Sequence, residues 1–275
     1  MKKWFITGIS SGLGKALAEA ALRKGHFVIG TMRDLQQVEA FNQTHASKAT
    51  AVALDLNDPQ GVEQTIAGIL ADHGPIDVLV NNAGTGFVGA VEETSSEEVR
   101  RVFETNFFGT LRITQLMLPH FRERKQGHII QISSHGGIKA FAGFGIYNAS
   151  KFALEGFSEA LAQEVGPLGI RVAIVEPGPF RTRFAGEGLQ EAETIIEDYA
   201  LTAGSFREKL KSVHGKQPGD PEKAALAIIE WVETPSSSLR LPLGSIALQT
   251  IAAKVQSVNQ DLERHRQQAL AADYT

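Results

Sequence analysis

A tyrosine and a lysine, Tyr147 and Lys151, lie four residues apart in a stretch that is predicted to be helical, so their side chains share one face. An ammonium group held beside a phenol stabilises the phenolate and lowers the pKa of the tyrosine from its ordinary value of about 10. Such a tyrosine can donate and accept a proton near neutral pH. A pair at this spacing is also common on solvated helix faces, so its meaning depends on the rest of the chain.

A glycine-rich turn at residues 7–14 reads Thr-Gly-Ile-Ser-Ser-Gly-Leu-Gly and lies between an apolar run and a predicted helix. Its glycines allow tight turning and a close approach of the backbone to a ligand. The N-terminus of the helix then offers unpaired N–H groups to a pyrophosphate. The spacing is G-x-x-x-G-x-G rather than the usual G-x-G-x-x-G. In preference to an ordinary βα turn, we predict a dinucleotide-binding loop made by Gly8, Ser10, Ser11, Gly12, Leu13 and Gly14.

The end of the second predicted strand carries Met32, Arg33 and Asp34. An acidic residue at that point would bind a ribose 2′-hydroxyl, whereas an arginine accommodates a 2′-phosphate. Met32 holds the place of the acid and Arg33 follows it, so NADP(H) is favoured and NAD(H) is the alternative. The hydroxyls of Ser10 and Ser11 could add donors to the phosphate. Asp34 either caps the next helix, which we prefer, or turns toward the ribose.

Polar residues follow the third and fourth predicted strands, on the side of the sheet where ligands bind. Asp55 ends the third strand and could accept a hydrogen bond from an adenine amino group. Asn82, Ala83 and Gly84 follow the fourth strand and are predicted to border the cofactor. Asn81 either holds strand ends together or contacts the cofactor, and the two interpretations have equal weight.

Asn106 lies among apolar residues at helical spacing and therefore on a buried helix face. A polar side chain there needs hydrogen-bond partners, so Asn106 is either a satisfied core residue or part of a water relay to the active site. Ser133 and Ser134 end the fifth strand, where the Ser134 hydroxyl could hold a substrate carbonyl oxygen beside Tyr147. Neither serine lies in the G-x-S-x-G elbow of hydrolases. A catalytic role for His135 is disfavoured, because it points to the opposite face of an extended backbone from Ser134.

The elements that must position these side chains alternate between strand and helix about six times. The predicted strands are continuous apolar runs at residues 4–6, 27–31, 49–54, 76–80, 128–132 and 170–175. The predicted helices are 15–24, 35–43, one starting at Pro59 with Asp58 as its N-cap, 95–124 with a capping box of Ser95 and Glu98, and 147–164. Such runs indicate a parallel sheet covered on both faces. We therefore predict an α/β, doubly wound parallel sheet of Rossmann type, with ligands beyond the carboxyl ends of its strands.

The alternation stops after Pro177. Residues 180–215 mix polar and apolar side chains with several glycines and are predicted to form a mobile, partly helical lid over the substrate. A helix is predicted at residues 221–232, with Asp220 as its N-cap.

The C-terminal part of the chain is predicted to add one strand and one helix. Residues 239–243 suit a short edge strand, since proline is tolerated only there. A terminal helix at residues 251–271 belongs to a helical extension of about residues 245–275. None of this requires a second domain, so we predict a single domain over residues 1–275.

The composition of the chain excludes several classes of function. The 275 residues carry a net charge of −4, with 27 basic and 31 acidic residues interspersed, which argues against a nucleic-acid partner. There is no cysteine, so disulfides, thiolate metal sites and thiol catalysis are excluded. The histidines show no metal-ligand spacing such as H-E-x-x-H, and no metal is predicted. No apolar run suits a signal peptide or a membrane span, so we expect a cytoplasmic protein without membrane contact.

The ordered set of motifs resembles the short-chain dehydrogenase/reductase family over about residues 3–182. The resemblance is carried, in the order and spacing of the family, by Thr7, Gly8, Gly12, Gly14, the run 81–84, Asn106, Ser134, Tyr147, Lys151, Pro177 and Gly178. The stretch 28–34 is similar to the NADP(H)-preferring branch, and to members such as 17β-hydroxysteroid and retinol dehydrogenases. The region after residue 182 departs from the commonest family ending, a glycine-rich last strand, so there the resemblance gives little information on substrate.

The resemblance implies an NADP(H)-dependent oxidoreductase that moves hydride between nicotinamide and a carbonyl or secondary alcohol. It assigns Tyr147 as general acid in reduction and general base in oxidation, and Ser134 as the group that orients the substrate oxygen. Lys151 would lower the pKa of Tyr147 and, with Tyr147, contact the nicotinamide ribose, while Asn106 would hold a water that links Lys151 to solvent. The residues bordering the nicotinamide would be Pro177, Gly178 and Thr182.

The candidate substrate-binding residues are Ser134, Tyr147, Phe141 and Phe144. Further candidates nearby in the predicted fold are Ile138, Phe87, Phe180 and Phe184. Most of these side chains are apolar, which suits a hydrophobic or aromatic ketone, aldehyde or secondary alcohol. For each phenylalanine the alternative is simple packing against the lid.

In the resembled family, the helices that correspond to residues 97–124 and 147–166 form the dimer interface, often within a tetramer. We therefore expect a homodimer or homotetramer. The alternatives for function are a non-catalytic NADP(H)-binding sensor, an NAD-dependent dehydrogenase of the same family, and a member with non-redox chemistry such as an epimerase or dehydratase. The presence of both Tyr147 and Lys151 disfavours the sensor.

Overall fold

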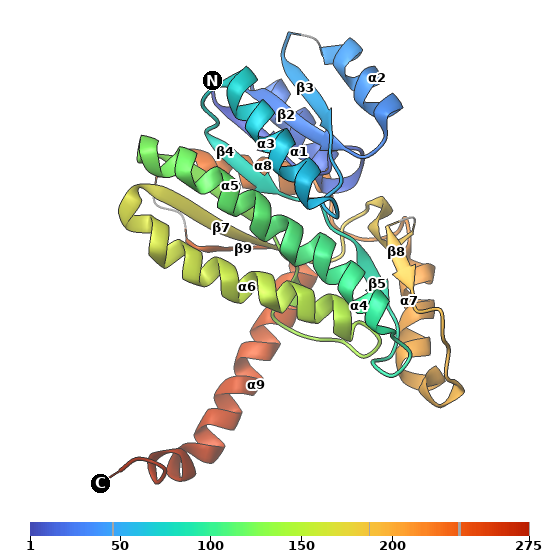
Figure 1. Ribbon diagram of the computed structural model, residues 1–275. Coiled ribbons are helices and arrows are strands. Elements are labelled where there is room, and N and C mark those ends of the chain that lie inside the picture. Colours follow the sequence, from blue (N-terminus) through green and yellow to red (C-terminus); the bar gives the residue numbers. More distant parts are fainter. Residues whose placement is uncertain (46, 187, 236–237, 275) are drawn as a thin grey trace.

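A seven-stranded parallel sheet forms the centre of the computed structural model, which describes residues 1–45, 47–186, 188–235 and 238–274 (Figure 1). The strand order is β3-β2-β1-β4-β6-β7-β9. The strands are β1 (Lys3–Ile6), β2 (Phe27–Met32), β3 (Ala49–Ala53), β4 (Val78–Asn81), β6 (Gly127–Ile132), β7 (Ile170–Pro177) and β9 (Arg240–Leu243). This is the doubly wound order, so the α/β fold of Rossmann type is confirmed.

The strands form where the sequence has continuous apolar runs, because both faces of a central parallel strand are buried. Trp4, Phe5 and Ile6 of β1, for example, are fully buried. Each predicted strand is present, with ends that differ by at most two residues from the prediction. The strand order reverses beside β1 and β4, so a crevice for ligands opens beyond the carboxyl ends of these two strands.

Helices cover both faces of the sheet (Figure 1). One face packs against α1 (Gly12–Arg23), α2 (Leu35–His45) and α8 (Pro221–Glu233). The other face packs against α3 (Pro59–His73), α5 (Gly109–Arg124) and α6 (Gly145–Val165). Because α1 begins at Gly12 and not at the predicted Lys15, its first turn belongs to the glycine-rich loop.

The prediction of one continuous α-helix over residues 95–124 is wrong. The structure has α4 (Ser96–Phe103), a π-helical turn η1 (Glu104–Phe108) and then α5. π-helical turns are rare, but those that occur are often found at functional sites. This one contains Asn106. The apolar periodicity of the sequence does not reveal this turn. Asn106 bonds to Thr85, in a loop that is distant in the sequence, and such a contact leaves no local pattern.

Of the helix caps predicted at Asp58, Ser95 and Asp220, the last two are confirmed. Ser95 Oγ accepts from the backbone N–H of Glu98 at 3.3 Å, and the Glu98 carboxylate accepts from the N–H of Ser95 at 2.8 Å. The Asp220 carboxylate accepts from the first turn of α8, at Glu222. Asp58 occupies the N-cap position of α3, but its carboxylate makes no capping hydrogen bond.

A second, two-stranded parallel sheet is absent from the sequence prediction. It pairs β5 (Gly86–Val88) with β8 (Leu189–Glu191). The strand β8 lies in the predicted lid, which also contains the helix α7 (Ser205–Val213), while residue 187 of that segment lies outside the described residues. Three-residue strands carry too little alternation to be recognised, and their pairing joins parts of the chain about a hundred residues apart.

The chain ends in α9 (Ser245–Leu270), which follows the edge strand β9. The helix starts at Ser245, earlier than the predicted Ile251. Figure 1 shows α9 projecting away from the layers of the sheet and its helices. Ala247, in its first turn, is its one buried residue, so most of this helix lies outside the core.

Candidate functional site

The side chains of Tyr147, Ser134 and Lys151 meet at the carboxyl end of β6. Tyr147, in the first turn of α6, is 4% exposed and shares a hydrogen bond with the Ser134 side chain. The Ser134 hydroxyl also accepts from the N–H of Gly136 at 3.0 Å. Lys151 Nζ donates to the Ile132 carbonyl at 2.9 Å and lies 6.0 Å from the centre of the Tyr147 ring. The structure therefore brings together the three residues in which the sequence predicts proton chemistry.

Burial dominates the titration of Tyr147 and of Lys151. It raises the pKa of Tyr147 to about 12, and the hydrogen bond with Ser134 only partly opposes this. It lowers the pKa of Lys151 to about 8, although the Glu155 carboxylate favours the charged form. In the protein alone, therefore, the Tyr147 pKa is not lowered as the sequence predicts. Desolvation of the phenol outweighs the effect of an ammonium group at this separation.

Asn106 makes hydrogen bonds through both ends of its amide. Its Oδ1 accepts from the N–H of Thr85 at 2.8 Å, and its Nδ2 donates to the Thr85 carbonyl at 2.9 Å and to Ser150 Oγ at 3.0 Å. A Cβ placed on Gly84 would lie 3.2 Å from Asn106 Oδ1 and 3.6 Å from Lys151 Nζ. Asn106 is thus a satisfied core residue whose carbamoyl oxygen faces the same small space as the Lys151 ammonium group.

The glycine-rich loop has the shape expected of a pyrophosphate cradle. Gly8 and Gly12 have φ values of 72° and 60°, which favour glycine. A Cβ on Gly14 would lie 2.3 Å from the Gly8 carbonyl oxygen and from Asn82 Nδ2, so no side chain fits there. Ser11, the N-cap of α1, makes no side-chain bond to the first turn of the helix. The N–H groups of this turn and the serine hydroxyl form a donor set that suits a pyrophosphate.

The residues after β4 connect this loop to Lys151. Asn82 Nδ2 donates to the carbonyls of Thr7 at 2.8 Å and Gly8 at 3.0 Å, and Ala83 N donates to Thr7 Oγ1 at 3.0 Å. Gly84 follows directly, beside the Lys151 ammonium group. The run 82–84 therefore spans the crevice between the predicted pyrophosphate and nicotinamide positions.

Asn81 has the structural role that the sequence left as one of two interpretations. Its Nδ2 donates to Thr114 Oγ1 at 2.9 Å and to Gln131 Oε1 at 3.0 Å, deep in the core. These bonds tie the end of β4 to α5 and β6.

The ends of β2 and β3 place three polar residues on the surface. Arg33 is exposed, directly after β2, whose Thr31 Oγ1 accepts from the N–H of Gly8 at 3.1 Å. Asp34 Oδ1 accepts from the N–H of Gln36 at 2.8 Å, so Asp34 caps α2, as we prefer from the sequence. Asp55 is exposed and accepts from the Asn57 backbone and side chain at 3.0 Å.

The three residues predicted beyond β7 lie on the other side of the crevice. Gly178 N donates to the Leu243 carbonyl at 2.9 Å, which joins the end of β7, at Pro177, to β9. Thr182 Oγ1 accepts from Phe184 N at 3.2 Å. A Cβ on Gly12 would lie 3.4 Å from the Thr182 side chain, so Thr182 and the glycine-rich loop face each other.

Aromatic side chains cover Tyr147. Its ring centre lies 4.4 Å from that of Phe144 and 5.5 Å from that of Phe184. Phe206 of α7, which the sequence analysis overlooks, lies 5.3 Å from Phe144 and 6.0 Å from Phe141. The apolar spacing of Phe206 and Leu210 on a helix face is the signal that could have identified it.

Other predicted pocket residues lie elsewhere. Phe87 packs against Val102 and Ala192, and Phe180 packs against the core on the α1 side of the sheet. The His135 ring packs 5.3 Å from that of Phe141, and burial lowers its pKa. Phe87 and Phe180 therefore pack against core residues of the protein and do not cover Tyr147.

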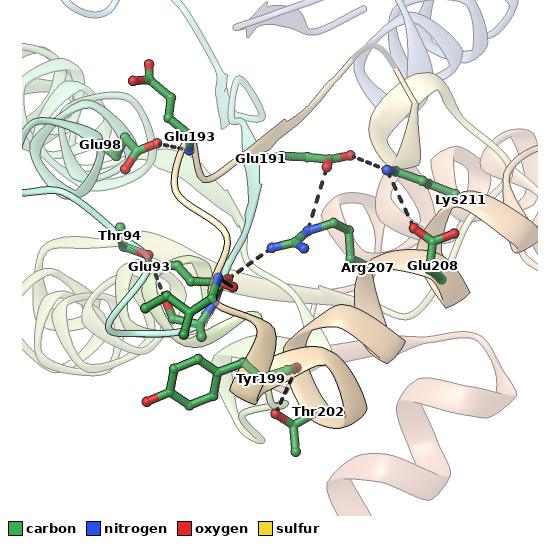
Figure 2. Close-up of polar contacts among 12 residues, drawn as sticks. Glu93, Thr94, Glu98, Glu191, Glu193, Tyr199, Thr202, Arg207, Glu208 and Lys211 are labelled. Carbon is green, nitrogen blue, oxygen red and sulfur yellow. Dashed lines mark hydrogen bonds and ion pairs between the residues drawn. The ribbon is translucent and has the colours of Figure 1, made fainter.

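A buried ion pair holds the segment between β7 and α8 against the loop after β5 (Figure 2). Arg207 of α7 and Glu93 are 6% and 3% exposed, and Arg207 Nη2 lies 3.0 Å from Glu93 Oε2. Glu93 also accepts from the N–H groups of Ala90 at 2.7 Å and Ile196 at 3.0 Å. Burial would raise the pKa of Glu93, but these backbone bonds and the Arg207 charge hold it below its usual value. Glu191 of β8 lies 3.6 Å from Arg207 Nε and extends the network.

A second charged cluster lies behind Lys151, on the same face of α6. Glu155 is four residues further along the helix and is bound by Arg240 of β9, which also pairs with Glu159 and Glu176. Burial, with a smaller contribution from Glu176, raises the pKa of Glu155 to about 7, and Arg240 opposes this. The spacing from Lys151 is a signal for this cluster in the sequence, but nothing local points to Arg240.

Within the described ranges, no helix is long and apolar enough to cross a membrane. The same ranges hold no group of three or more histidine or acidic side chains suited to a metal ion.

The sequence matches the family model of the short chain dehydrogenases over residues 2–193. Oxidoreductase BOA17 of Botryotinia fuckeliana is 36% identical, covering 98% of this chain and 99% of its own. The 3-ketodihydrosphingosine reductase of Bacteroides thetaiotaomicron is 38% identical, covering 92% and 91%. Human retinol dehydrogenase 8 is 37% identical, covering 84% and 78%.

Solved structures agree with these sequence matches. A short-chain dehydrogenase from Streptomyces avermitilis is 42% identical, with a TM-score of 0.93 and coverage of 99% of this chain and 100% of that one. A serine dehydrogenase complexed with NADP+ is 25% identical, with a TM-score of 0.75 and coverage of 88% and 94%. A short-chain dehydrogenase/reductase from Burkholderia phymatum in complex with NAD shares the fold at 21% identity, with a TM-score of 0.83 and coverage of 94% and 95%.

Proposed function

We propose, because the chain belongs to the short-chain dehydrogenase family, that it is an NADP(H)-dependent oxidoreductase acting on a carbonyl or secondary alcohol of a hydrophobic small molecule. The observation that carries this proposal is the Tyr147 hydroxyl, buried and hydrogen-bonded to Ser134 under an aromatic cover. Lys151 lies one helical turn further on, beside the loops that suit a dinucleotide.

The proposed reaction assigns one task to each of these side chains. Tyr147 donates its proton to the substrate oxygen in reduction and removes a proton from the alcohol in oxidation. Ser134 donates a hydrogen bond to the same oxygen and stabilises charge there. When bound, the nicotinamide supplies or accepts the hydride. Burial keeps Tyr147 protonated at neutral pH, which is the form that reduction requires.

We assign positioning tasks to Lys151 and Asn106. The Lys151 ammonium group holds the nicotinamide ribose together with Tyr147, and its charge stabilises the phenolate that Tyr147 becomes. Asn106 Oδ1 faces the same space beside Gly84 as Lys151 Nζ, which supports a water held between them as a link to solvent.

The preference for NADP(H) rests on the end of β2. Met32 leaves that strand end without a carboxylate of its own, and Asp34 is engaged as the cap of α2. Arg33 is an exposed cation directly after β2 and suits a 2′-phosphate. We assign the remaining dinucleotide contacts to residues around the crevice: Gly8, Ser10, Ser11, Gly12, Leu13, Gly14, Asp55, Asn82, Ala83, Gly84, Pro177, Gly178 and Thr182.

We propose a hydrophobic substrate because the space around Tyr147 is lined by aromatic rings. Phe141 and Phe144 come from the segment before α6, and Phe184 and Phe206 from the segment after β7. Two relatives are named for 3-ketodihydrosphingosine and for retinol, and both of these molecules are largely apolar. The segment 180–215 would act as the lid that closes over such a molecule.

We also propose a homodimer or homotetramer through the surfaces of residues 97–124 and 147–166. Phe108 supports this, because this large apolar side chain is 45% exposed.

Replacing Tyr147→Phe tests the proposed reaction, because the substitution removes the hydroxyl and keeps the ring. We expect the wild type to oxidise NADPH with lipophilic ketones or aldehydes, and Tyr147→Phe to lose at least about 100-fold in turnover, the usual contribution of a general acid. NADPH binding, followed by fluorescence, should stay close to that of the wild type.

Tyr274→Phe is the matched control. Tyr274 is fully exposed and lies outside the proposed lid, so the loss of its hydroxyl should leave turnover unchanged. Turnover that survives in Tyr147→Phe would contradict the proposal. NADPH binding by a wild type that turns over no carbonyl would support the sensor instead.

A further inference from the structure

The helix α9 extends from the body with little of its surface covered (Figure 1). It has 26 residues and is therefore about 39 Å long. Ile251 and Lys254 are half-buried, and every residue from Val255 to the end of the helix is exposed. Helices in proteins gain most of their stability from packing an apolar face, so a long helix in this position requires a partner surface.

An apolar stripe runs along the exposed part of α9. Its spacing of three and four residues is that of the contact seam between two paired helices. The stripe consists of Leu248, Ile251, Val255, Val258 and Leu262. Val255, Val258 and Leu262 are 51%, 40% and 64% exposed. The part of the seam beyond Ile251 is therefore exposed along its length.

The same stripe borders a groove on the body. The groove has a volume of about 350 Å³ and lies between α9 and α6. Val255 and Val258 line one side, and Ile138 and Phe152 line the other. Phe152 is exposed, so the apolar surface continues from α9 onto the body.

We propose that α9 pairs in antiparallel fashion with α9 of a second copy of this chain, across a twofold axis near Gln256 and Ser257. In this register Ile251 faces Leu262 of the partner subunit, and Val255 faces Val258 of the partner subunit. The twofold axis repeats each contact, so the same seam on the two subunits forms both sides of the interface.

The charges beside the seam favour an antiparallel over a parallel pair. Lys254 faces Asp261 of the partner subunit, and the axis repeats the pair, so both flanking charges of the apolar centre are matched. A parallel pair in register would instead place Lys254 opposite Asn259 of the partner subunit. Antiparallel pairing also puts the two bodies at opposite ends of the paired helices and lays the end of one α9 along the groove of the other subunit.

The area available suits a specific contact. Two helices paired over about 39 Å bury on the order of 400 Å² each, if the covered strip is about 10 Å wide. The groove, with Ile138 and Phe152, adds to this, so the two partners together approach the roughly 1,000 Å² that a biological interface needs.

Disulfide trapping tests the pairing cleanly, because the chain has no cysteine. We would prepare Ile251→Cys and Leu262→Cys as separate full-length variants and oxidise each alone and in an equimolar mixture. Antiparallel pairing predicts cross-linked dimers that form at least about tenfold faster in the mixture than in either variant alone. Gln260→Cys, on the opposite face of α9, replaces Leu262→Cys in a control mixture that should cross-link only at background rate.

Charge reversal gives a second, independent measurement of the same contact. Lys254→Asp should slow the trapping of the Ile251→Cys and Leu262→Cys mixture, and combining it with Asp261→Lys in every chain should restore the rate. Background cross-linking in the mixture would overturn the proposal, whether α9 then packs on its own groove, on another protein or nowhere. Rapid cross-linking of either variant alone would overturn it too, because only a parallel pair places identical residues together. None of these outcomes depends on the proposed enzymatic activity.

Discussion

The hydroxyl of Tyr147 shows how strongly burial controls a single residue at this site. The side chain is only 4% exposed, and this burial favours the neutral phenol and raises its pKa to about 12. Burial also disfavours the charged form of the neighbouring Lys151 and lowers its pKa to about 8. At neutral pH the protein therefore holds a protonated tyrosine beside a charged lysine. In the proposed reaction that combination donates a proton, and Ser134 would stabilise the charge that develops on the acceptor.

Arg33→Ala tests the cofactor preference at the scale of one residue. Arg33 is exposed and can give a charge-assisted bond to a 2′-phosphate, so its loss should weaken NADPH binding about tenfold and leave NADH binding unchanged. Fluorescence titration of both nucleotides measures the two constants. Arg100→Ala, which removes an exposed arginine of α4, is the control and should alter neither. Equal NADPH affinity in wild type and Arg33→Ala would remove the argument for NADP(H).

Glu155→Gln tests the effect of burying a carboxyl group behind Lys151. The pKa of Glu155 in the folded protein is raised to about 7, so its contribution to stability is fully present below the unfolded pKa and is lost as pH rises through about 7. Glutamine cannot ionise. The unfolding free energy of Glu155→Gln relative to wild type should therefore rise between pH about 5 and about 8.5, by up to the order of 3 kcal/mol.

The charged groups that face Glu155 are Lys151, Glu159, Glu176 and Arg240, so part of the expected change is shared with them. Urea unfolding at the two pH values measures the change. Glu97→Gln, on an exposed position of α4, is the control and should show the same difference from wild type at both. A pH-independent difference for Glu155→Gln would show that this carboxyl group does not titrate with a raised pKa.

At the scale of elements, the cover over Tyr147 is built from short pieces that depend on one another. The strand β8 pairs with β5, α7 presents Phe206 to Phe144, and the Arg207–Glu93 ion pair fixes α7 against the loop after β5. None of these pieces has an independent core. The Glu93 carboxylate satisfies two backbone N–H groups and one guanidinium at once, so it is a buried point at which the cover is attached (Figure 2).

Arg207→Met should loosen this cover, because it leaves the Glu93 carboxylate buried without its charge partner. Breaking a buried pair in this way costs about 3–5 kcal/mol of stability. We expect KM for a hydrophobic substrate to rise more than kcat falls, because Tyr147, Ser134 and Lys151 lie outside α7. Thermal unfolding and steady-state kinetics measure the two effects.

The double variant Glu93→Gln with Arg207→Met should recover part of the stability, since it removes both charges. Arg100→Met breaks an ion pair with Glu97 whose side chains are 78% and 80% exposed, and such a pair contributes at most about 1 kcal/mol. An Arg207→Met variant as stable as Arg100→Met would refute the attachment at Glu93.

At the scale of the whole molecule, strand order decides where the chemistry takes place. The reversal beside β1 and β4 opens the crevice into which Gly8, Asn82 and Gly84 project, and β6 next to β4 brings Ser134 to the same edge. The glycine-rich loop and the Tyr147 site come from segments more than a hundred residues apart. They form one site because their strands are neighbours in the sheet.

NADPH should therefore stabilise the whole fold rather than one loop. At a concentration about 100 times its dissociation constant, a ligand that binds only the folded state adds about 2.7 kcal/mol, which corresponds to a rise in Tm of about 5 °C for a domain of this size. Differential scanning fluorimetry measures the shift.

Two glycine substitutions provide the matched pair for this measurement. Gly14→Ala places a Cβ 2.3 Å from the Gly8 carbonyl oxygen and should abolish the shift, with folding checked by circular dichroism. Gly156→Ala, on α6, meets no atom within 4 Å and should keep it. An unchanged shift in a folded Gly14→Ala would exclude this loop as the pyrophosphate site.

The sequence by itself determined the features that depend on neighbouring residues. Apolar runs specified the strands, and the capping residues Ser95 and Asp220 specified helix starts, because both are local physics. The spacing of glycines in the first turn and of Tyr147 and Lys151 also identified the family, since those residues act within one loop or one helical turn.

Only the tertiary structure decided what depends on distant segments meeting. It placed Asn106 in a π-helical turn bonded to Thr85, attached α7 through Glu93, and surrounded Tyr147 with Phe206. It also reversed the expected direction of the Tyr147 pKa, because that value depends on how completely other segments exclude water. Burial, unlike spacing, is a property of the folded chain as a whole, and no local pattern of residues contains it.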